Sequence, residues 1–285
     1  EKAISIHRSL IARENINEST RLRALKELAI DFDKGGFLDK AIETYKDVLK
    51  INRDQAEVIQ ALCRIYEDVG DWDQAYNYRI MLTKVGYENQ SETISHILVE
   101  KAKLYFDQGE EKLCLDTLDD AFKFSPSVTA KILLLKLYLV QGKLDDAKVL
   151  LTELVREHPM YASFIFVSLE DMIIQDKKVM YYERLAHLKK FFLETEDKTL
   201  LASPSIVLSQ IRLMKSEDKI NEAFEKLSNW MKENKNQSDI LKIELIKLLI
   251  DVGQKDEALK QTQGLLNSFH STLTRHYCSQ CGYNS

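Results

Sequence analysis

The stretch LAIDFDKGGFLDKAIETY, residues 28–45, decides the fold. It holds the end of one helical pattern at Phe32, a turn at Gly35-Gly36 and a second helical pattern in which Ala41 and Tyr45 stand four residues apart. A small residue lets two helices cross closely, and the aromatic side chain fills the space beside it. Glycine permits the tight turn. The stretch therefore predicts two antiparallel helices joined by a short turn.

The same pattern recurs along the chain. The small residues of the second helices stand at positions 3, 41, 75, 114, 147, 223 and 258, which gives intervals of 38, 34, 39, 33, 76 and 35 residues. The interval of 76 spans two periods, and we expect a degenerate unit there, centred near Ala186. A helix–turn–helix period of about 34 residues is that of the tetratricopeptide repeat. The sequence predicts an all-α, right-handed solenoid with at least fourteen helices and no sheet.

Two segments are expected. Residues 1–273 form the repeat array, and residues 274–285 form a short terminal CxxC segment. The first unit, residues 1–20, shows only its second helix, and seven further units follow. Ala41, Ala75, Ala147 and Ala258 are expected to be buried where helices cross. The seven full-length units are expected at about residues 21–55, 56–92, 93–128, 129–160, 161–200, 201–239 and 240–273.

Composition narrows the function. The chain has 285 residues, 30% of them charged, and a net charge of −5, so no basic bias indicates nucleic-acid binding. No apolar run reaches the roughly 18 residues that a membrane span needs. The six histidines share no spacing, and no nucleophile, phosphate-loop or metalloprotease motif occurs. The sequence predicts a non-catalytic binding scaffold.

One position of the first helices is mostly basic. It directly follows the small residue of each first helix, and first helices line the concave surface of stacked repeats. Five of its six occupants are cations in an acidic chain, although exposed helix positions favour lysine and arginine in any case. We interpret these five as a candidate groove for an acidic protein segment: Arg64, Lys103, Lys136, Arg212 and Lys247.

The four cysteines fall into two kinds. Cys63 and Cys114 stand at small-residue positions of the repeats, so we expect both to be buried and inert. Cys278 and Cys281 form a CxxC followed by Gly282 and Tyr283, which is typical of a zinc or rubredoxin-type knuckle. The alternative is an incidental tail. A thioredoxin-like motif fits poorly, because no βαβ pattern surrounds it.

The combination resembles the lipopolysaccharide assembly protein B family of Gram-negative bacteria. The resemblance rests on the repeats, on the terminal Tyr277-Cys278-x-x-Cys281-Gly282-Tyr283, and on the runs at residues 2–10 and 21–32. It covers almost the whole chain and is weakest over residues 161–240. It implies a non-catalytic protein at the cytoplasmic face of the inner membrane. Its implied partners are a membrane-anchored AAA+ protease, the deacetylase of the lipid A pathway and other lipopolysaccharide assembly proteins.

The sequence departs from the family in two places. The N-terminal membrane anchor and the second CxxC of the rubredoxin-like module are both missing, so residues 274–285 match only the first half of that module. A closed metal site needs four ligands. We therefore expect zinc or iron, ligated in part by Cys278 and Cys281, in a longer protein, and no stoichiometric metal in this chain alone.

Two other functions fit the sequence. One is a generic co-chaperone or assembly scaffold that binds peptide segments in its concave groove. The other is a catalytic protein, such as a sugar transferase, that carries these repeats beside a further domain.

Overall fold

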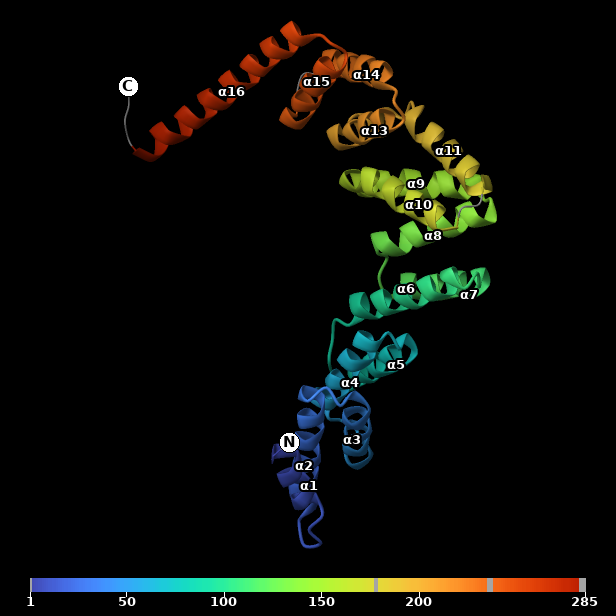
Figure 1. Ribbon diagram of the computed structural model, residues 1–285, viewed down its shortest axis with the longest axis vertical. Coiled ribbons are helices and arrows are strands. Elements are labelled where there is room, and N and C mark those ends of the chain that lie inside the picture. Colours follow the sequence, from blue (N-terminus) through green and yellow to red (C-terminus); the bar gives the residue numbers. More distant parts are fainter. Residues whose placement is uncertain (1, 177–178, 235–237, 282–285) are drawn as a thin grey trace. The chain divides into compact units, whose positions relative to one another are not determined.

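The computed structural model of the chain describes the backbone of residues 2–176, 179–234 and 238–281, and the side chains of residues 2–171, 180–234 and 238–269 (Figure 1). These residues form sixteen α-helices and one short 3-10 helix, with no strand among them. The predicted all-α class and the minimum of fourteen helices are confirmed. The chain divides into two compact units, Glu1–Leu137 and Tyr138–Ser285, and each is described separately.

The first unit holds three complete helix pairs. The lone helix α1 precedes them, and α8 begins the next pair at the boundary between the units. The bounds are α1 (Lys2–Ile11), α2 (Glu18–Lys34), α3 (Leu38–Ile51), α4 (Ala56–Val69), α5 (Trp72–Lys84), α6 (Ser91–Asp107), α7 (Glu111–Phe124) and α8 (Val128–Gln141).

The second unit continues the alternation of first and second helices. The pairs α10/α11, α13/α14 and α15/α16 pack internally, and α10 also packs against α13. The bounds are α9 (Leu144–Glu157), η1 (Pro159–Tyr161), α10 (Ala162–Asp176), α11 (Val179–Leu193), α12 (Lys198–Leu201), α13 (Pro204–Ser216), α14 (Ile220–Glu233), α15 (Asp239–Asp251) and α16 (Lys255–Cys281).

The turn between α4 and α5 shows how the sequence produces a helix pair. Gly70 ends α4 with φ of +75°, a left-handed conformation that glycine adopts without the steric cost of a Cβ. Its N–H donates to carbonyls of the last turn of α4. Asp71 then accepts a hydrogen bond from the Gln74 N–H at 3.1 Å and so caps the start of α5. Two adjacent residues thus end one helix and begin the next.

The predicted crossing residues are buried. Ala41, Ala75 and Ala147 have no exposed surface and Ala258 is 4% exposed, so the repeat register is confirmed at these four positions. Larger side chains surround the crossings. Each fully buried side chain of this size contributes about 1.5–3 kcal/mol by leaving water, and in α4 these are Ile59, Leu62 and Ile65.

The degenerate unit lacks the small crossing residue of the other units. Ala186, near which this unit was expected to be centred, is exposed in α11. The buried face of α11 carries only bulky residues, and no small residue brings a partner close: Tyr181, Leu185, Leu188, Phe192 and Leu193. The next full helix, α13, begins at Pro204, whose fixed φ suits the first turn of a helix.

The last helix is longer than the repeat requires. α16 continues through Cys278 to Cys281 instead of ending near residue 273. The side chains of residues 270–281, and all of residues 282–285, lie outside the described part of the chain. The terminal CxxC knuckle and the handedness of the solenoid therefore stay predictions.

Candidate protein-binding surface

The five predicted cations lie on first helices in both units. Arg64, Lys103 and Lys136 belong to α4, α6 and α8 in the first unit, and Arg212 and Lys247 belong to α13 and α15 in the second. They thus occupy equivalent helices of successive repeats, as the repeat register predicted. Each cation is described below in its own unit.

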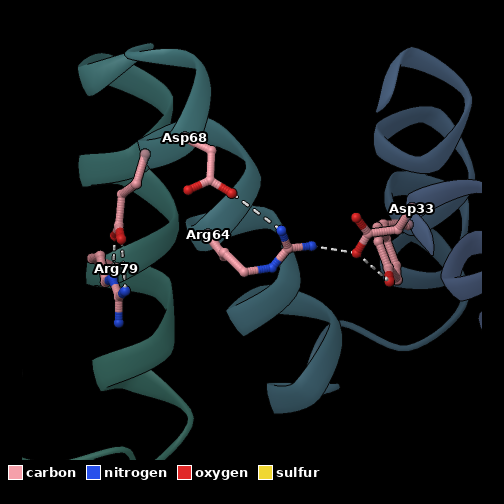
Figure 2. A network of polar contacts seen from close by, with 6 residues as sticks. Asp33, Arg64, Asp68 and Arg79 are labelled. Atoms are coloured by element: carbon pink, nitrogen blue, oxygen red, sulfur yellow. Dashed lines mark hydrogen bonds and ion pairs between the residues drawn. The ribbon is translucent and has the colours of Figure 1, made fainter. Parts of the chain in front are cut away.

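Arg64 is bound by two carboxylates. One guanidinium nitrogen donates to Asp33 on α2, and another donates to Asp68 at 3.1 Å (Figure 2). The hydrogen bond to Asp33 raises the pKa of Arg64 above its ordinary value. Tyr45 of α3 also donates to Asp33, at 3.5 Å, and burial together with this carboxylate raises the pKa of Tyr45 to about 12. Asp33 therefore links the first helix of one repeat to the first helix of the next.

A second ion pair in the same region is structural. Arg79 of α5, labelled in Figure 2, binds the carboxylate of Glu67 on α4 through two nitrogens, at 2.7 and 3.1 Å. Its third nitrogen donates to Gln90 at 3.0 Å. Paired N–H groups on one carboxylate give a strong and geometrically defined contact. Arg79 is largely buried, so we assign it to holding α4 against α5 and not to partner binding.

Lys103 and Lys247 have carboxylate partners one turn earlier on their own helices. Lys103 binds Glu100, and Lys247 lies 3.4 Å from Glu244. Glu244 is 8% exposed and also lies 3.4 Å from Lys215 of α13, so two cations compensate one buried carboxylate. Such compensation is needed because burying an unpaired charge is costly.

Arg212 differs from these three. Arg212 is exposed on α13 and has no carboxylate partner in the part of the chain whose side chains are described. Lys136 is half-buried within the apolar helix α8. Arg64, Lys103 and Lys247 are thus neutralised by carboxylates of the chain itself. These carboxylates offset much of the repulsion between neighbouring cations of the first helices. An acidic partner therefore meets an uncompensated cation at Arg212.

The sequence-based interpretation missed an apolar patch in the degenerate unit. The buried residues Ile165, Phe166 and Leu169 of α10 align with Leu62, Cys63 and Tyr66 of α4, which places Val167 at the position that Arg64 occupies. Val167 is exposed, and so are three large apolar neighbours: Met160 at 83%, Tyr161 and Phe164. Tyr161 packs edge-on against Phe164, with ring centroids 6.4 Å apart.

Exposed apolar patches of this kind commonly mark surfaces that bind other proteins. The signal was present in the sequence. α10 is apolar on nearly all sides, whereas a first helix with one solvent face should alternate between apolar and polar faces. This unit has no recognisable crossing residue, so the sequence did not show which positions of α10 match those of the other first helices. The exposed face of α10 could therefore not be predicted.

The thiols follow the prediction for the repeats. Cys63 and Cys114 are fully buried, and burial raises the pKa of each thiol to about 11. Among the residues with described side chains, no cluster of three or more histidine, cysteine or acidic residues is arranged to bind a metal. The assignment of Cys278 and Cys281 as ligands stays a prediction.

Comparison with known proteins gives the following relatives. No protein-family model matches the chain. Lipopolysaccharide assembly protein B of Haemophilus influenzae is 24% identical over 290 residues, which cover 99% of this chain and 70% of that protein. The protein of the same name from Escherichia coli K12 is 26% identical over 102 residues, which cover 36% of this chain and 26% of the relative.

Solved structures of repeat proteins are also similar. A tetratricopeptide repeat protein from Parabacteroides merdae has a TM-score of 0.38 at 18% identity, with 87% of this chain and 92% of that chain covered. YrrB, described as a tetratricopeptide protein with an unusual peptide-binding site, has a TM-score of 0.35 at 14% identity and covers 63% of this chain and 89% of its own.

Two further observations bear on function. Within the described residues, no helix combines the length and the apolar character that crossing a bilayer requires. The curated relatives are named as assembly proteins, which agrees with the prediction of a non-catalytic chain. The described residues form an array of helix pairs, and the sequence is similar along nearly its whole length to lipopolysaccharide assembly protein B of Haemophilus influenzae, as predicted.

Proposed function

We propose that the chain is a protein-binding scaffold in lipopolysaccharide assembly. The observation that carries this proposal is the similarity over 99% of the chain to a protein named for that role. The structure supports a binding role in two ways. Its first helices expose cations, of which Arg212 is uncompensated, and α10 exposes an apolar patch around Phe164.

The finer proposal is an adaptor. In it, the chain works at the cytoplasmic face of the inner membrane and brings the deacetylase of the lipid A pathway to a membrane-anchored AAA+ protease. The first-helix surface is the part of the chain that captures a partner. Arg212 binds an acidic segment of the partner directly, whereas Arg64 and Lys103 contribute less, because each must first release a carboxylate of the chain itself.

The test measures the deacetylase in cells. The gene that encodes the chain is depleted in its native bacterium, and the half-life of the deacetylase is followed after protein synthesis stops. We expect the half-life to lengthen on depletion and to return when the gene is restored. An unchanged half-life would contradict the adaptor role. If partners still co-purify in that case, the chain is instead a general assembly scaffold.

A charge-reversal set locates the surface. Arg64, Lys103 and Lys136 are replaced together by Glu, and the amount of deacetylase that co-purifies is measured. The matched control reverses three cations of the second helices. Each of them pairs with an acid three residues earlier, as Lys103 does: Lys50, Lys123 and Lys148. Both sets change the net charge equally. We expect the first set to lose co-purification and the second to keep it. Equal loss in both would exclude the first-helix surface as the docking site.

A further inference from the structure

A groove between α1 and α3 is separate from the first-helix cations. Two adjoining cavities, of about 400 and 340 Å³, share the lining residues Arg8, Phe32 and Lys40. Phe32 on α2 is 4% exposed, and the groove lies over it. α1 contributes Arg8 and apolar residues including Ile4 and Ile11, and α3 contributes Lys40 and Thr44.

The groove holds two cations over aromatic rings. The Arg8 guanidinium carbon lies 5.3 Å from the centroid of the Phe32 ring. The Lys40 ammonium lies 6.0 Å from the same centroid and 5.5 Å from that of Phe37. Both cations are exposed, and neither has a carboxylate partner in the described part of the chain. No acidic residue lines the smaller cavity, whereas Glu43 and Asp47 line the larger one, and Asp47 is bound to Lys50 at 2.7 Å.

The next repeat contains the same arrangement with its space filled. There Lys46 of α3 lies 5.6 Å from the centroid of the Tyr66 ring of α4, as Arg8 of α1 lies over Phe32 of α2. Tyr78 of α5 stacks on Tyr66, with centroids 5.5 Å apart and ring planes 8° apart. In this repeat the ring of Tyr66 thus contacts both the Lys46 ammonium and the ring of Tyr78.

The corresponding position in the first repeat is Thr44. Thr44 stands three residues after the crossing residue Ala41, as Tyr78 stands three residues after Ala75. The Thr44 hydroxyl donates to the Lys40 carbonyl within α3, at 2.7 Å, and Thr44 lines the larger cavity beside Phe32. Phe37 packs edge-on against Phe32, with ring centroids 6.4 Å apart, but no ring stands at the position in α3 that Tyr78 occupies in α5.

We propose that this groove binds a segment of a partner protein in which an aromatic residue stands next to an acidic one. The aromatic side chain takes the place over Phe32 that Tyr78 takes over Tyr66, where stacking and burial stabilise it. The adjacent carboxylate lies between Arg8 and Lys40, which supply charge-assisted hydrogen bonds. The groove uses α1 and α3 and none of the five first-helix cations, so it is a second binding site that does not depend on the proposed adaptor role.

The experiment uses short peptides and the purified 285-residue chain. A blocked peptide of sequence Gly-Ser-Asp-Phe-Ser-Gly is titrated by calorimetry beside two matched peptides, one with Lys in place of Asp and one with Ala in place of Phe. We expect the Asp-Phe peptide to bind about tenfold more tightly than either, because each control loses one of the two contacts. Equal affinity for the Lys peptide would overturn the proposal.

Filling the groove supplies the decisive variant. Thr44→Tyr places a ring where Tyr78 lies in the next repeat, and we expect it to abolish peptide binding. The control is Thr117→Tyr, because Thr117 stands three residues after Cys114 in α7 and its hydroxyl also donates to a carbonyl four residues earlier, at 2.7 Å. Thr117→Tyr should bind as the wild type does. Binding retained by Thr44→Tyr would show that the peptide lies elsewhere.

A second variant keeps the test independent of folding. Replacing Arg8 and Lys40 by Gln leaves the apolar floor intact, and we expect the preference for Asp-Phe over Lys-Phe to disappear while weak binding of the ring remains. An unchanged preference would contradict the assignment of these two cations.

Sedimentation at rising protein concentration tests whether a second copy of the chain occupies the groove. Self-association that Thr44→Tyr abolishes would identify a second copy of the chain as the ligand and overturn the proposal.

Discussion

The Arg64 side chain of α4 binds the carboxylate of Asp33 on α2, in the preceding repeat. Arg64 also donates to Asp68 at 3.1 Å and is nevertheless 52% exposed. In the second unit, Arg212 occupies the same repeat position without a described carboxylate partner. The same position of the repeat therefore holds a compensated cation in one unit and an uncompensated cation in the other.

This difference predicts unequal roles in partner binding. An acidic partner must displace Asp33 or Asp68 to bind Arg64, whereas it binds Arg212 without such an exchange. We expect Arg212→Gln to weaken binding of the purified lipid A pathway deacetylase by about three- to tenfold, and Arg64→Gln by less than about twofold. Titrations at low and high salt should show that only the Arg212→Gln variant has a clearly reduced salt dependence.

The control compares the two variants in the absence of partner. Arg212→Gln removes no described ion pair and should unfold close to the wild type in urea, whereas Arg64→Gln leaves the largely buried Asp33 without its guanidinium and should unfold somewhat earlier. A larger loss of affinity in Arg64→Gln than in Arg212→Gln would contradict the view that intramolecular carboxylates compete with the partner.

The helix pairs could be predicted because their signals are local. The crossing alanines and the turn glycines each act within a few residues of their position, and the structure confirms them. The packing of the degenerate unit could not be predicted, because an interval of two periods does not show which face of α11 is buried. The partner of Arg64 could not be predicted, since Asp33 lies 31 residues earlier and the contact depends on how repeats stack.

Enlarging a crossing residue should destabilise the first unit. Ala75 of α5 is fully buried where α5 crosses its neighbours, so Leu in its place must force the helices apart. We expect Ala75→Leu to lower the free energy of unfolding by about 1–3 kcal/mol, measured by urea denaturation followed by circular dichroism. The transition should broaden if the repeats lose cooperativity.

Ala186→Leu is the matched control for Ala75→Leu. Ala186 is exposed in the middle of α11, so the same substitution adds no buried volume, and leucine and alanine have similar helix propensities. This variant should unfold within about 0.5 kcal/mol of the wild type. If both variants melt like the parent, the assigned register of the crossings is incorrect.

Two turn glycines should differ in their tolerance of a side chain. Gly70 and Gly142 have φ of +75° and +74°, so alanine at either position costs about 1 kcal/mol of backbone strain. A Cβ on Gly70 meets no atom within 4 Å, whereas one on Gly142 lies 2.9 Å from the guanidinium of Arg184. Arg184 donates to the carbonyls of Leu139 and Val140, at 2.7 and 2.6 Å.

We therefore expect Gly142→Ala to be the more destabilising of the two. It adds the loss of one or both Arg184 hydrogen bonds, about 1 kcal/mol beyond Gly70→Ala, in thermal or urea unfolding. The double variant Gly142→Ala with Arg184→Ala identifies the cause, because the extra cost of the alanine should vanish once the guanidinium is gone. An undiminished cost in the double variant would assign the effect to backbone strain alone.

The buried thiol of Cys63 predicts a loss of stability at alkaline pH. Burial raises the pKa of Cys63 from its ordinary value of 9.0 to about 11. Between these values the unfolded chain loses the thiol proton while the folded chain keeps it, so unfolding releases a proton and the free energy of unfolding falls as pH rises. The contribution of the protonated thiol to stability is complete below about pH 9 and is lost as pH rises toward about 11.

Cys63→Ala removes this group but leaves every other titrating residue, including Tyr45 with its raised pKa, in place. At about pH 8 the variant should be less stable than the wild type, because a fully buried side chain has become smaller. That gap in urea midpoint should narrow when both proteins are compared at about pH 10, since only the wild type pays the proton-linked cost. A gap of constant size across this pH range would mean that water reaches the thiol in the folded chain.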